Sequence, residues 1–170
     1  IYAGRDWTMR GTVIRHNFLH HIMGFEDRGC VGVYLDDMFS GTNIHGNVFY
    51  RVHWAAFIGG GRDNVYADNL FVDCPMALHI DARATNWAAD HVETTMTERL
   101  HAMPFRDAPW KDRFPQLLTI LDDEPAAPKG NVIEKNVFYG ENWNHVTGDA
   151  QPYVTLGVNL ENVDPLLVHG

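Results

Sequence analysis

Aspartates at the ends of two short apolar runs are the residues whose types and spacing point most directly to chemistry. Asp36 and Asp37 end the run that begins at Gly32, and Asp81 ends the run that begins at Ala77. Two carboxyl groups beside a small cleft can cleave a glycosidic bond, because one protonates the leaving oxygen while the other activates water or attacks directly. Asp37 is expected to raise the pKa of one of the pair by like-charge repulsion. The candidate catalytic residues are therefore Asp36, Asp37 and Asp81, and no metal ligand is assigned.

Candidate substrate-binding side chains lie close to these aspartates in the sequence. His79 shares a strand face with Asp81 and could orient or protonate it. Two arginines follow the strand ends and could hold sugar hydroxyls or tune the carboxyl groups, and three aromatic residues could offer flat faces to pyranose rings. These substrate-binding candidates are Tyr34, Phe57, Arg62, His79, Arg83 and Trp87.

Each of these residues also has a purely structural interpretation. An aspartate that ends a strand is a common turn residue, and Asp37 fits that role as well as a catalytic one. Arg62 with the adjacent Asp63 is typical of an ion pair within a loop. Trp87 could pack against neighbouring helices instead of a sugar. The sequence leaves these alternatives open.

An internal repeat predicts the elements that position the aspartates. One pattern has a β-type apolar pair, two mostly polar or small residues, an Asn and two more apolar residues, and a second pattern ends in a small or acidic residue. The first occurs at Val13–Leu19, Asn43–Phe49, Val65–Phe71 and Val132–Phe138, and the second at Gly32–Asp36, Ala55–Gly59, Ala77–Asp81 and Tyr153–Gly157. Leu35, Ile58 and Ile80 are 23 and 22 residues apart. That period is typical of one coil of a β-solenoid and too short for a helix-pair repeat.

The repeat unit is predicted to be one short strand, a turn at Asn, another short strand and a loop. The repeated asparagines are Asn17, Asn47, Asn69 and Asn136. Asn tolerates the left-handed backbone of a sharp corner, and stacked Asn side chains can hydrogen-bond from one coil to the next. We expect these four residues to be structural.

Strand alternation predicts which face each residue of the second pattern occupies. The apolar positions, such as Leu35 and Ile58, point inward, so Asp36, Gly59 and Asp81 share an outward row. The backbones of Asp36 and Asp81, two strands apart, should lie about 9.6 Å from each other. Gly59 lies between them without a side chain and is expected to open a notch.

Residues 82–130 interrupt the repeat. Helices are predicted over 90–103 and 109–121, where apolar residues recur at helical spacing. The segment is too short for a core of its own and is expected to pack on the solenoid. The chain 1–170 is therefore predicted to be one all-β domain of about four coils, with a helical insertion between the third and the fourth.

Composition narrows the classes of function. The 170 residues, of which 45% are hydrophobic, suit one packed domain. A net charge of -9 repels phosphate backbones, so nucleic acid is not an expected partner. No apolar run approaches the length of a membrane span, so no membrane partner is expected either.

Three linked motifs carry a resemblance to known proteins. The runs Gly32–Asp37, Ile58–Asn64 and His79–Arg83, followed by a Trp-containing helical segment and Pro128–Ile133, resemble right-handed parallel β-helix proteins of the pectate-lyase-like superfamily, and most closely the group around glycoside hydrolase family 141. The resemblance implies a secreted or periplasmic glycosidase that degrades plant or algal polysaccharide. By motif position, Asp36 or Asp37 and Asp81 would be its catalytic carboxylates.

Length separates this chain from those relatives, which have several hundred residues and many more coils. The chain is therefore expected to be a fragment, and the open ends of its core could support an oligomer. Two alternatives to a hydrolase remain: a polysaccharide lyase that binds Ca²⁺ through the acidic residues, and a non-catalytic carbohydrate-binding β-helix. A hydrolase would need no cofactor, and its partner would be a poly- or oligosaccharide.

Overall fold

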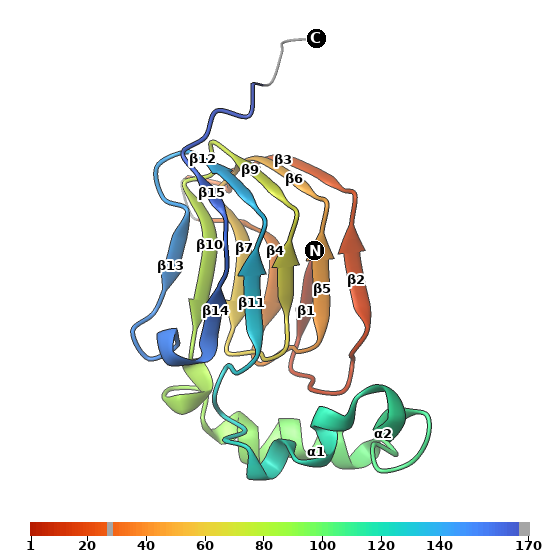
Figure 1. Ribbon diagram of the computed structural model, residues 1–170. Helices are drawn as coiled ribbons and strands as arrows, with labels where there is room; N and C mark the ends of the chain where they lie inside the picture. Colours follow the sequence, from red (N-terminus) through yellow and green to blue (C-terminus); the bar gives the residue numbers. More distant parts are fainter. Residues whose placement is uncertain (27–28, 167–170) are drawn as a thin grey trace.

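The computed structural model describes residues 1–26 and 29–166 and contains three parallel β-sheets of five strands each (Figure 1). The chain visits the sheets in turn, and every pair of hydrogen-bonded strands is parallel. This arrangement confirms the prediction of a mainly β, solenoid-like fold and is consistent with a parallel β-helix.

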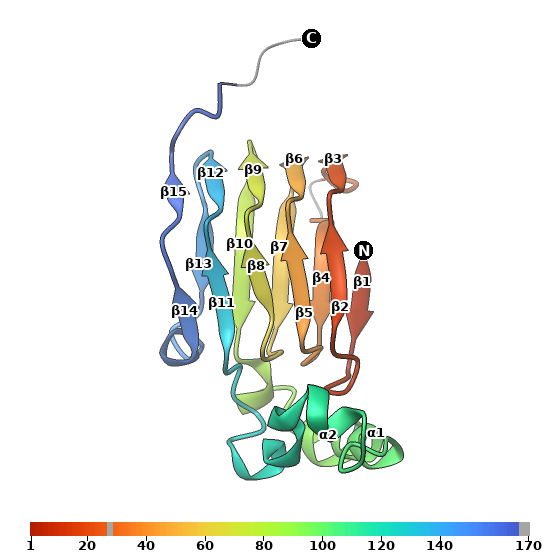
Figure 2. The ribbon, with the colours of Figure 1, turned by 45° about the vertical axis from the view of Figure 1, so that its right-hand side comes forward.

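The strands of each sheet stack in sequence order (Figure 2). The first sheet contains β1 (Tyr2–Gly4), β4 (Val31–Asp36), β7 (Trp54–Gly59), β10 (Met76–Asp81) and β13 (Asn144–Val146). The second contains β2 (Thr12–Arg15), β5 (Thr42–His45), β8 (Val65–Ala67), β11 (Asn131–Glu134) and β14 (Val154–Leu156). The third contains β3 (Phe18–Ile22), β6 (Val48–Val52), β9 (Leu70–Val72), β12 (Val137–Tyr139) and β15 (Leu160–Glu161).

The predicted two-strand repeat unit is wrong, because the first sequence pattern itself holds two strands, one on each side of its Asn. A further strand from the second pattern makes three. The run Tyr153–Gly157 fits the second pattern, yet its strand β14 pairs with β11 in the second sheet. The place beside β10 belongs to β13, which pairs His79 with His145.

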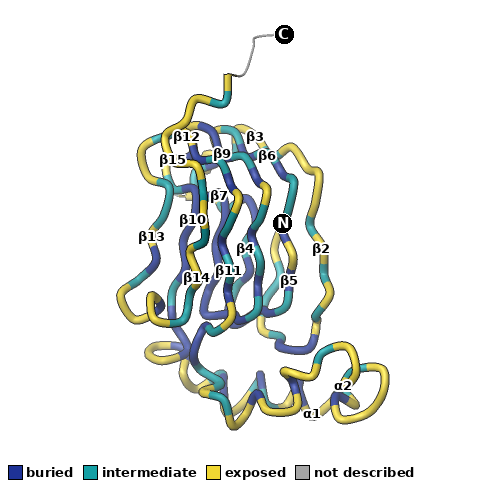
Figure 3. Tube along the Cα trace, in the orientation of Figure 1, coloured by how far each residue is buried: buried dark blue, intermediate teal, exposed yellow. Residues whose placement is uncertain are grey.

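Apolar side chains from all three sheets fill the interior. Val33, Leu35 and Ile58 are buried as the alternation predicts. In the third sheet the rings of Phe49, Phe71 and Phe138 stack with centroids 4.8 Å apart, which matches the spacing of neighbouring strands. Figure 3 shows this buried interior along β4, β7 and β10, with β2 and the helices more exposed.

A ladder of asparagines joins the coils, as predicted. Asn17 donates from Nδ2 to Oδ1 of Asn47, Asn47 to Asn69, and Asn69 to Asn136, over 2.9–3.0 Å. Asn136 continues to Asn159, which the repeat did not reveal. The left-handed residue is the one before each Asn, so the predicted reason for Asn at the corner is wrong; these residues are His16, Gly46, Asp68 and Lys135. Asn is needed for its side-chain amide, which bonds the next coil.

The segment between β10 and β11 is helical and lies beyond the carboxyl ends of β4, β7 and β10 (Figures 1 and 2). Its regular parts are the 3-10 turn Arg83–Thr85, a π-helical stretch Val92–Met96, α1 (Thr97–Ala102), α2 (Trp110–Arg113) and the 3-10 turns Pro115–Leu118 and Ile120–Asp122. Another 3-10 turn, Gln151–Tyr153, precedes β14.

Only the first of the two predicted helices runs unbroken. Residues 90–102 are continuously helical, close to the predicted range 90–103. The predicted helix 109–121 is broken into short pieces, because Pro115 cannot donate the backbone hydrogen bond that would continue α2. Trp7 and Met38 of the solenoid pack in one apolar cluster with Met96 and Leu100 of the helical segment.

Candidate functional site

The carboxyl ends of β4, β7 and β10 bring the predicted site residues other than Arg62 together on the outward face of the first sheet. The register aligns Tyr34 with Phe57 and Phe57 with His79. Gly59 pairs with Asp81, and Leu35 pairs with Ile58, which places Asp36 on the other side of Gly59. The predicted row of Asp36, Gly59 and Asp81 is therefore present.

The notch over Gly59 is filled, contrary to the prediction that it is open. A Cβ atom added at Gly59 would lie 2.6 Å from Cζ of Arg83, which is closer than real Cβ contacts come. A larger residue here would displace the guanidinium group of Arg83, which lies over the backbone of Gly59. The side chain of Arg83 is only 6% exposed.

Arg83 bridges all three candidate carboxylates. Its Nη1 donates to Asp36 Oδ1 over 2.6 Å and to Asp37 Oδ1 over 3.1 Å. Its Nη2 donates to Asp81 Oδ2 over 2.7 Å, and its Nε and backbone N–H also donate to Asp81. Burial lowers the pKa of Arg83, but the hydrogen bonds to Asp81 and its other partners raise this pKa by more, so the net shift is upward.

Asp81 is held in its ionised form by these contacts. Burial alone would raise its pKa, but hydrogen bonds from His79 and Arg83, together with the charge of Arg83, lower the pKa of Asp81 to about 2. The Nε2 atom of His79 lies 3.3 Å from Asp81 Oδ2, so the predicted contact between these two residues is present. Asp81 is therefore ionised near neutral pH, which is the state that a base or a nucleophile requires.

Asp37 differs from its neighbour Asp36 in burial and in partners. Asp37 is 3% exposed, and Nε of Arg5 donates a hydrogen bond to its Oδ2 over 2.8 Å. Burial favours the neutral acid, yet hydrogen bonds from Arg83 and Arg5 outweigh it and lower the pKa of Asp37. The rise that like-charge repulsion by Asp37 is expected to cause in one of the pair is not found at Asp81, whose pKa is lowered by His79 and Arg83.

Aromatic rings extend the site along the same face. Tyr34 and Phe57 have ring centroids 4.6 Å apart, and Trp54 stacks on Phe57 at 5.2 Å. An open groove beside them is lined by Gly29, Val31, Tyr34, His53, Trp54 and Phe57. Trp87 is 70% exposed, and the guanidinium carbon of Arg83 lies 5.2 Å from the centre of its ring. All three aromatic candidates thus lie close to the carboxylates.

Arg62 lies apart from this cluster. It is buried and donates from Nη2 to Asp123 over 2.6 Å, while its Nε lies 4.0 Å from Asp63. Asp123 also receives a hydrogen bond from Lys129. Arg62 therefore ties the end of the helical segment to the solenoid, and its assignment as a substrate-binding residue is replaced by this structural role.

Sequence reasoning missed three residues of the site. Trp54 is two residues before the inward-facing Ala56, so strand alternation predicts an inward side chain and gives no signal for its outward ring. Tyr2 donates from its hydroxyl to Asp36 Oδ2 over 3.0 Å, and only its pairing with Tyr34 in the first sheet reveals this. His145 lies with Nδ1 2.9 Å from Nδ1 of His79, on the strand that was not assigned to this sheet.

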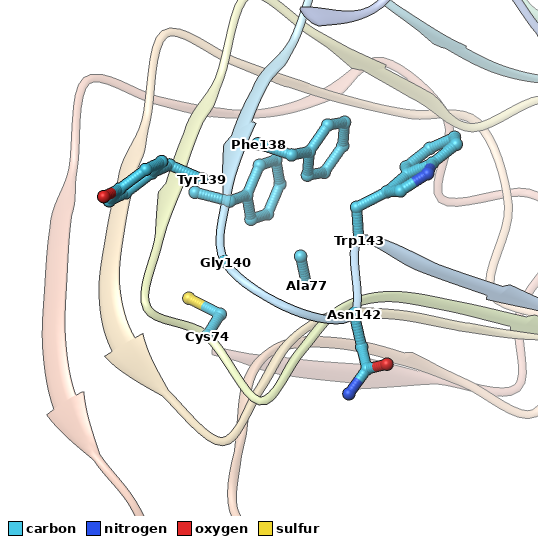
Figure 4. Close-up of a pocket in the computed structure, with 8 residues that line it drawn as sticks. Cys74, Ala77, Phe138, Tyr139, Gly140, Asn142 and Trp143 are labelled. Carbon is cyan, nitrogen blue, oxygen red and sulfur yellow. The ribbon is translucent and has the colours of Figure 1, made fainter. Parts of the chain in front are cut away.

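A second, interior pocket is too small to bind a substrate. It lies at the corner between β12 and β13, where Cys74, Ala77, Phe138 and Trp143 line it (Figure 4). Its volume is about 10 Å³, roughly the space of one water molecule. Burial raises the pKa of the Cys74 thiol to about 11, so this cysteine stays protonated.

Along residues 1–26 and 29–166, no group of three or more His, Cys, Asp or Glu side chains is arranged to share a metal ion. No helix of these same stretches has the length and apolar character of a membrane span. Comparison with known proteins gives no match to a family model, to a curated protein or to a solved structure.

The lowered pKa of Asp81 predicts a loss of stability in acid. Its pKa is about 2 in the folded protein and about 3.9 in an unfolded chain, so its contribution is complete above pH 4 and is lost as the pH falls towards 2. The expected loss of unfolding free energy from Asp81 is on the order of 2 kcal/mol. Urea unfolding at pH 5 and pH 2 measures it. Asp81→Asn should lose less over the same interval, and an equal loss in both proteins would assign the effect to other groups.

Proposed function

We propose that the protein is a glycoside hydrolase that degrades a plant or algal cell-wall polysaccharide through Asp36 and Asp81. The observation that carries this proposal is the outward row in which these two carboxyl groups flank Gly59. Two carboxyl groups on one accessible face are what acid–base cleavage of a glycosidic bond requires. The proposed partner is a poly- or oligosaccharide, and no cofactor is assigned.

The two aspartates differ in how tightly Arg83 holds them, and this difference suggests their roles. Asp81 receives Nε, Nη2 and the backbone N–H of Arg83, which favours its role as the carboxylate that activates water or attacks the sugar. Asp36 receives Nη1 of Arg83 and the hydroxyl of Tyr2. We assign proton donation to Asp36, which requires that Nη1 leaves it when the glycan binds. When Nη1 leaves Asp36, Arg83 remains paired with Asp37.

Flat aromatic faces support a sugar as the ligand. Tyr34 and Trp54 are partly exposed and Trp87 is exposed, whereas Phe57 is buried and packs against the rings of Tyr34 and Trp54. Trp54 continues the aromatic surface into the open groove. Rings with exposed faces bury the apolar side of a pyranose while its hydroxyl groups reach polar neighbours. Trp54 is therefore added to the proposed substrate-binding residues.

One observation favours a second candidate, a non-catalytic carbohydrate-binding solenoid. Arg83 compensates the charge of Asp36, Asp37 and Asp81 together, as a structural ion cluster would. In that case the aromatic groove binds glycan and the aspartates hold the strand ends. The Ca²⁺-dependent lyase is less well supported, because the guanidinium of Arg83 occupies the space between the carboxylates that a cation would need.

A substrate screen separates these candidates. The purified chain is incubated with xylans, pectins, and fucosylated and galactosylated glycans, with and without EDTA. A hydrolase releases reducing ends, is insensitive to EDTA and forms no unsaturated, ultraviolet-absorbing product. A lyase forms that product and loses activity in EDTA. Glycan binding without any product would leave the carbohydrate-binding candidate, and the hydrolase proposal would then be abandoned.

The remaining parts of the proposal follow the family resemblance. We propose a right-handed β-helix of about four coils, similar to glycoside hydrolase family 141, in which residues 82–130 form an insertion. Secretion or a periplasmic location would bring such an enzyme to its polysaccharide. Exposed apolar side chains on the outermost strands, such as Phe18 of β3 and Leu160 of β15, would support an oligomer through the ends of the solenoid.

A further inference from the structure

Two histidines on neighbouring strands face each other through the same type of ring nitrogen. His79 of β10 pairs in register with His145 of β13, and their Nδ1 atoms are 2.9 Å apart. On its other side, Nε2 of His79 lies 3.3 Å from Oδ2 of Asp81. The three side chains therefore form one line from the candidate carboxylate to the protein surface.

The contacts of His79 with Asp81 and with His145 together fix which nitrogen of each ring carries a proton. An ionised carboxylate only accepts hydrogen bonds, so the contact with His79 requires a proton on Nε2 of that ring. A neutral His79 then has an unprotonated Nδ1, which can only accept. The donor in the 2.9 Å contact must therefore be Nδ1–H of His145.

Packing leaves His79 little alternative to this arrangement. His79 is 7% exposed, and the ring centroids of Phe57 and Trp54 lie 4.3 and 5.2 Å from the centroid of its ring. A buried ring nitrogen needs a hydrogen-bond partner, and His145 supplies one for Nδ1. His145 itself is exposed, so its Nε2 can exchange hydrogen bonds with water.

We propose that His145 is a positioning residue that holds His79 in the Nε2–H tautomer and thereby directs a hydrogen bond at Asp81. In catalytic triads a third group acts in the same way, by fixing the tautomer and orientation of a histidine that acts on its neighbour. The consequence for turnover rests on the proposed glycosidase function. The order of the hydrogen bonds is independent of that function, because it follows from the three side chains alone.

The tautomers can be observed directly by NMR. Long-range proton–nitrogen correlation spectra of the ¹⁵N-histidine-labelled chain near pH 8 report which nitrogen of each neutral ring carries hydrogen. We expect His79 as the Nε2–H form and His145 as the Nδ1–H form, which is the minor form of a free histidine in water. Spectra of the His79→Gln and His145→Gln variants assign the signals. A proton on Nδ1 of His79, or on Nε2 of neutral His145, would overturn the proposal.

Variants of His145 test whether it acts through His79. His145→Phe keeps an aromatic ring but has no donor, so His79 should become a mixture of tautomers. His145→Gln keeps an N–H donor and should retain the Nε2–H form of His79. His101→Phe, on the exposed side of α1, is the matched control. An unchanged His79 spectrum in His145→Phe would show that His145 does not set the tautomer.

Kinetics with a substrate from the screen add a second measurement. In His145→Phe we expect kcat to fall about tenfold or more with KM nearly unchanged, and His145→Gln should recover most of the loss. Equal kcat values in wild type and His145→Phe would contradict the positioning role. If no substrate is turned over, the glycosidase proposal fails, while the NMR result still decides the hydrogen-bond order.

Discussion

Replacement of Arg83 by methionine is expected to lower the free energy of unfolding by about 3–5 kcal/mol, because it leaves buried carboxylates without their counter-ion. Methionine keeps much of the apolar stem but none of the donors. Asp37 is almost fully buried, and Asp36 and Asp81 are only partly exposed, so water replaces the lost hydrogen bonds in part and least at Asp37. Chemical unfolding of the two proteins at pH 7 measures the difference.

Arg51→Met is the matched control for this experiment. Arg51 lies 3.8 Å from Asp73, and both side chains are about half exposed, so the control should change stability by less than about 0.5 kcal/mol. The loss in Arg83→Met should also shrink as the pH is lowered, because protonation removes the uncompensated charge of the carboxylates. A loss below about 1 kcal/mol at pH 7 would contradict the counter-ion role of Arg83.

Asp81→Asn is expected to reduce turnover of a glycan substrate by about 10²–10⁴-fold while the affinity for that glycan persists. Asparagine has nearly the shape of aspartate but cannot take a proton from water or attack the sugar. The same substitution at Asp36 should have an effect of the same kind, because it removes the proposed proton donor. Initial rates measure turnover, and titration calorimetry with the same glycan measures binding.

Asp73→Asn provides the comparison for these two variants. Asp73 is exposed at the corner between β9 and β10 and has a left-handed backbone that asparagine adopts readily. The Asp73→Asn variant should retain both turnover and glycan binding. Turnover that survives in Asp81→Asn would remove Asp81 from the catalytic pair, whatever happens to stability.

The sequence predicts the row of Asp36, Gly59 and Asp81 because two regular signals coincide there. Alternation within a strand assigns the face, and the spacing of 22–23 residues between Leu35, Ile58 and Ile80 assigns the register. The asparagine ladder is predictable for the same reason, since a residue that recurs once per coil must stack on its copies.

The position of Arg83 in the notch over Gly59 and the presence of His145 in the site cannot be predicted in this way, for physical reasons. Arg83 lies beyond the end of β10, in a 3-10 turn where no periodicity fixes the direction of a side chain. Its entry into the notch depends on the missing Cβ of Gly59, which shows only when the coils are stacked. β13 has just three residues and one buried position, Val146, so its alternation is too short to recognise.

The asparagine ladder also bears on how such a molecule can change its length. Each rung joins only the coils directly above and below it, and Asn47 and Asn69 are 22 residues apart. A stretch of that size could be duplicated or excised in register, and the remaining rungs would close on one another. The ladder alone is therefore compatible with a different number of coils, but the stretch between Asn47 and Asn69 contains Gly59, and its removal would take away the backbone on which Arg83 rests.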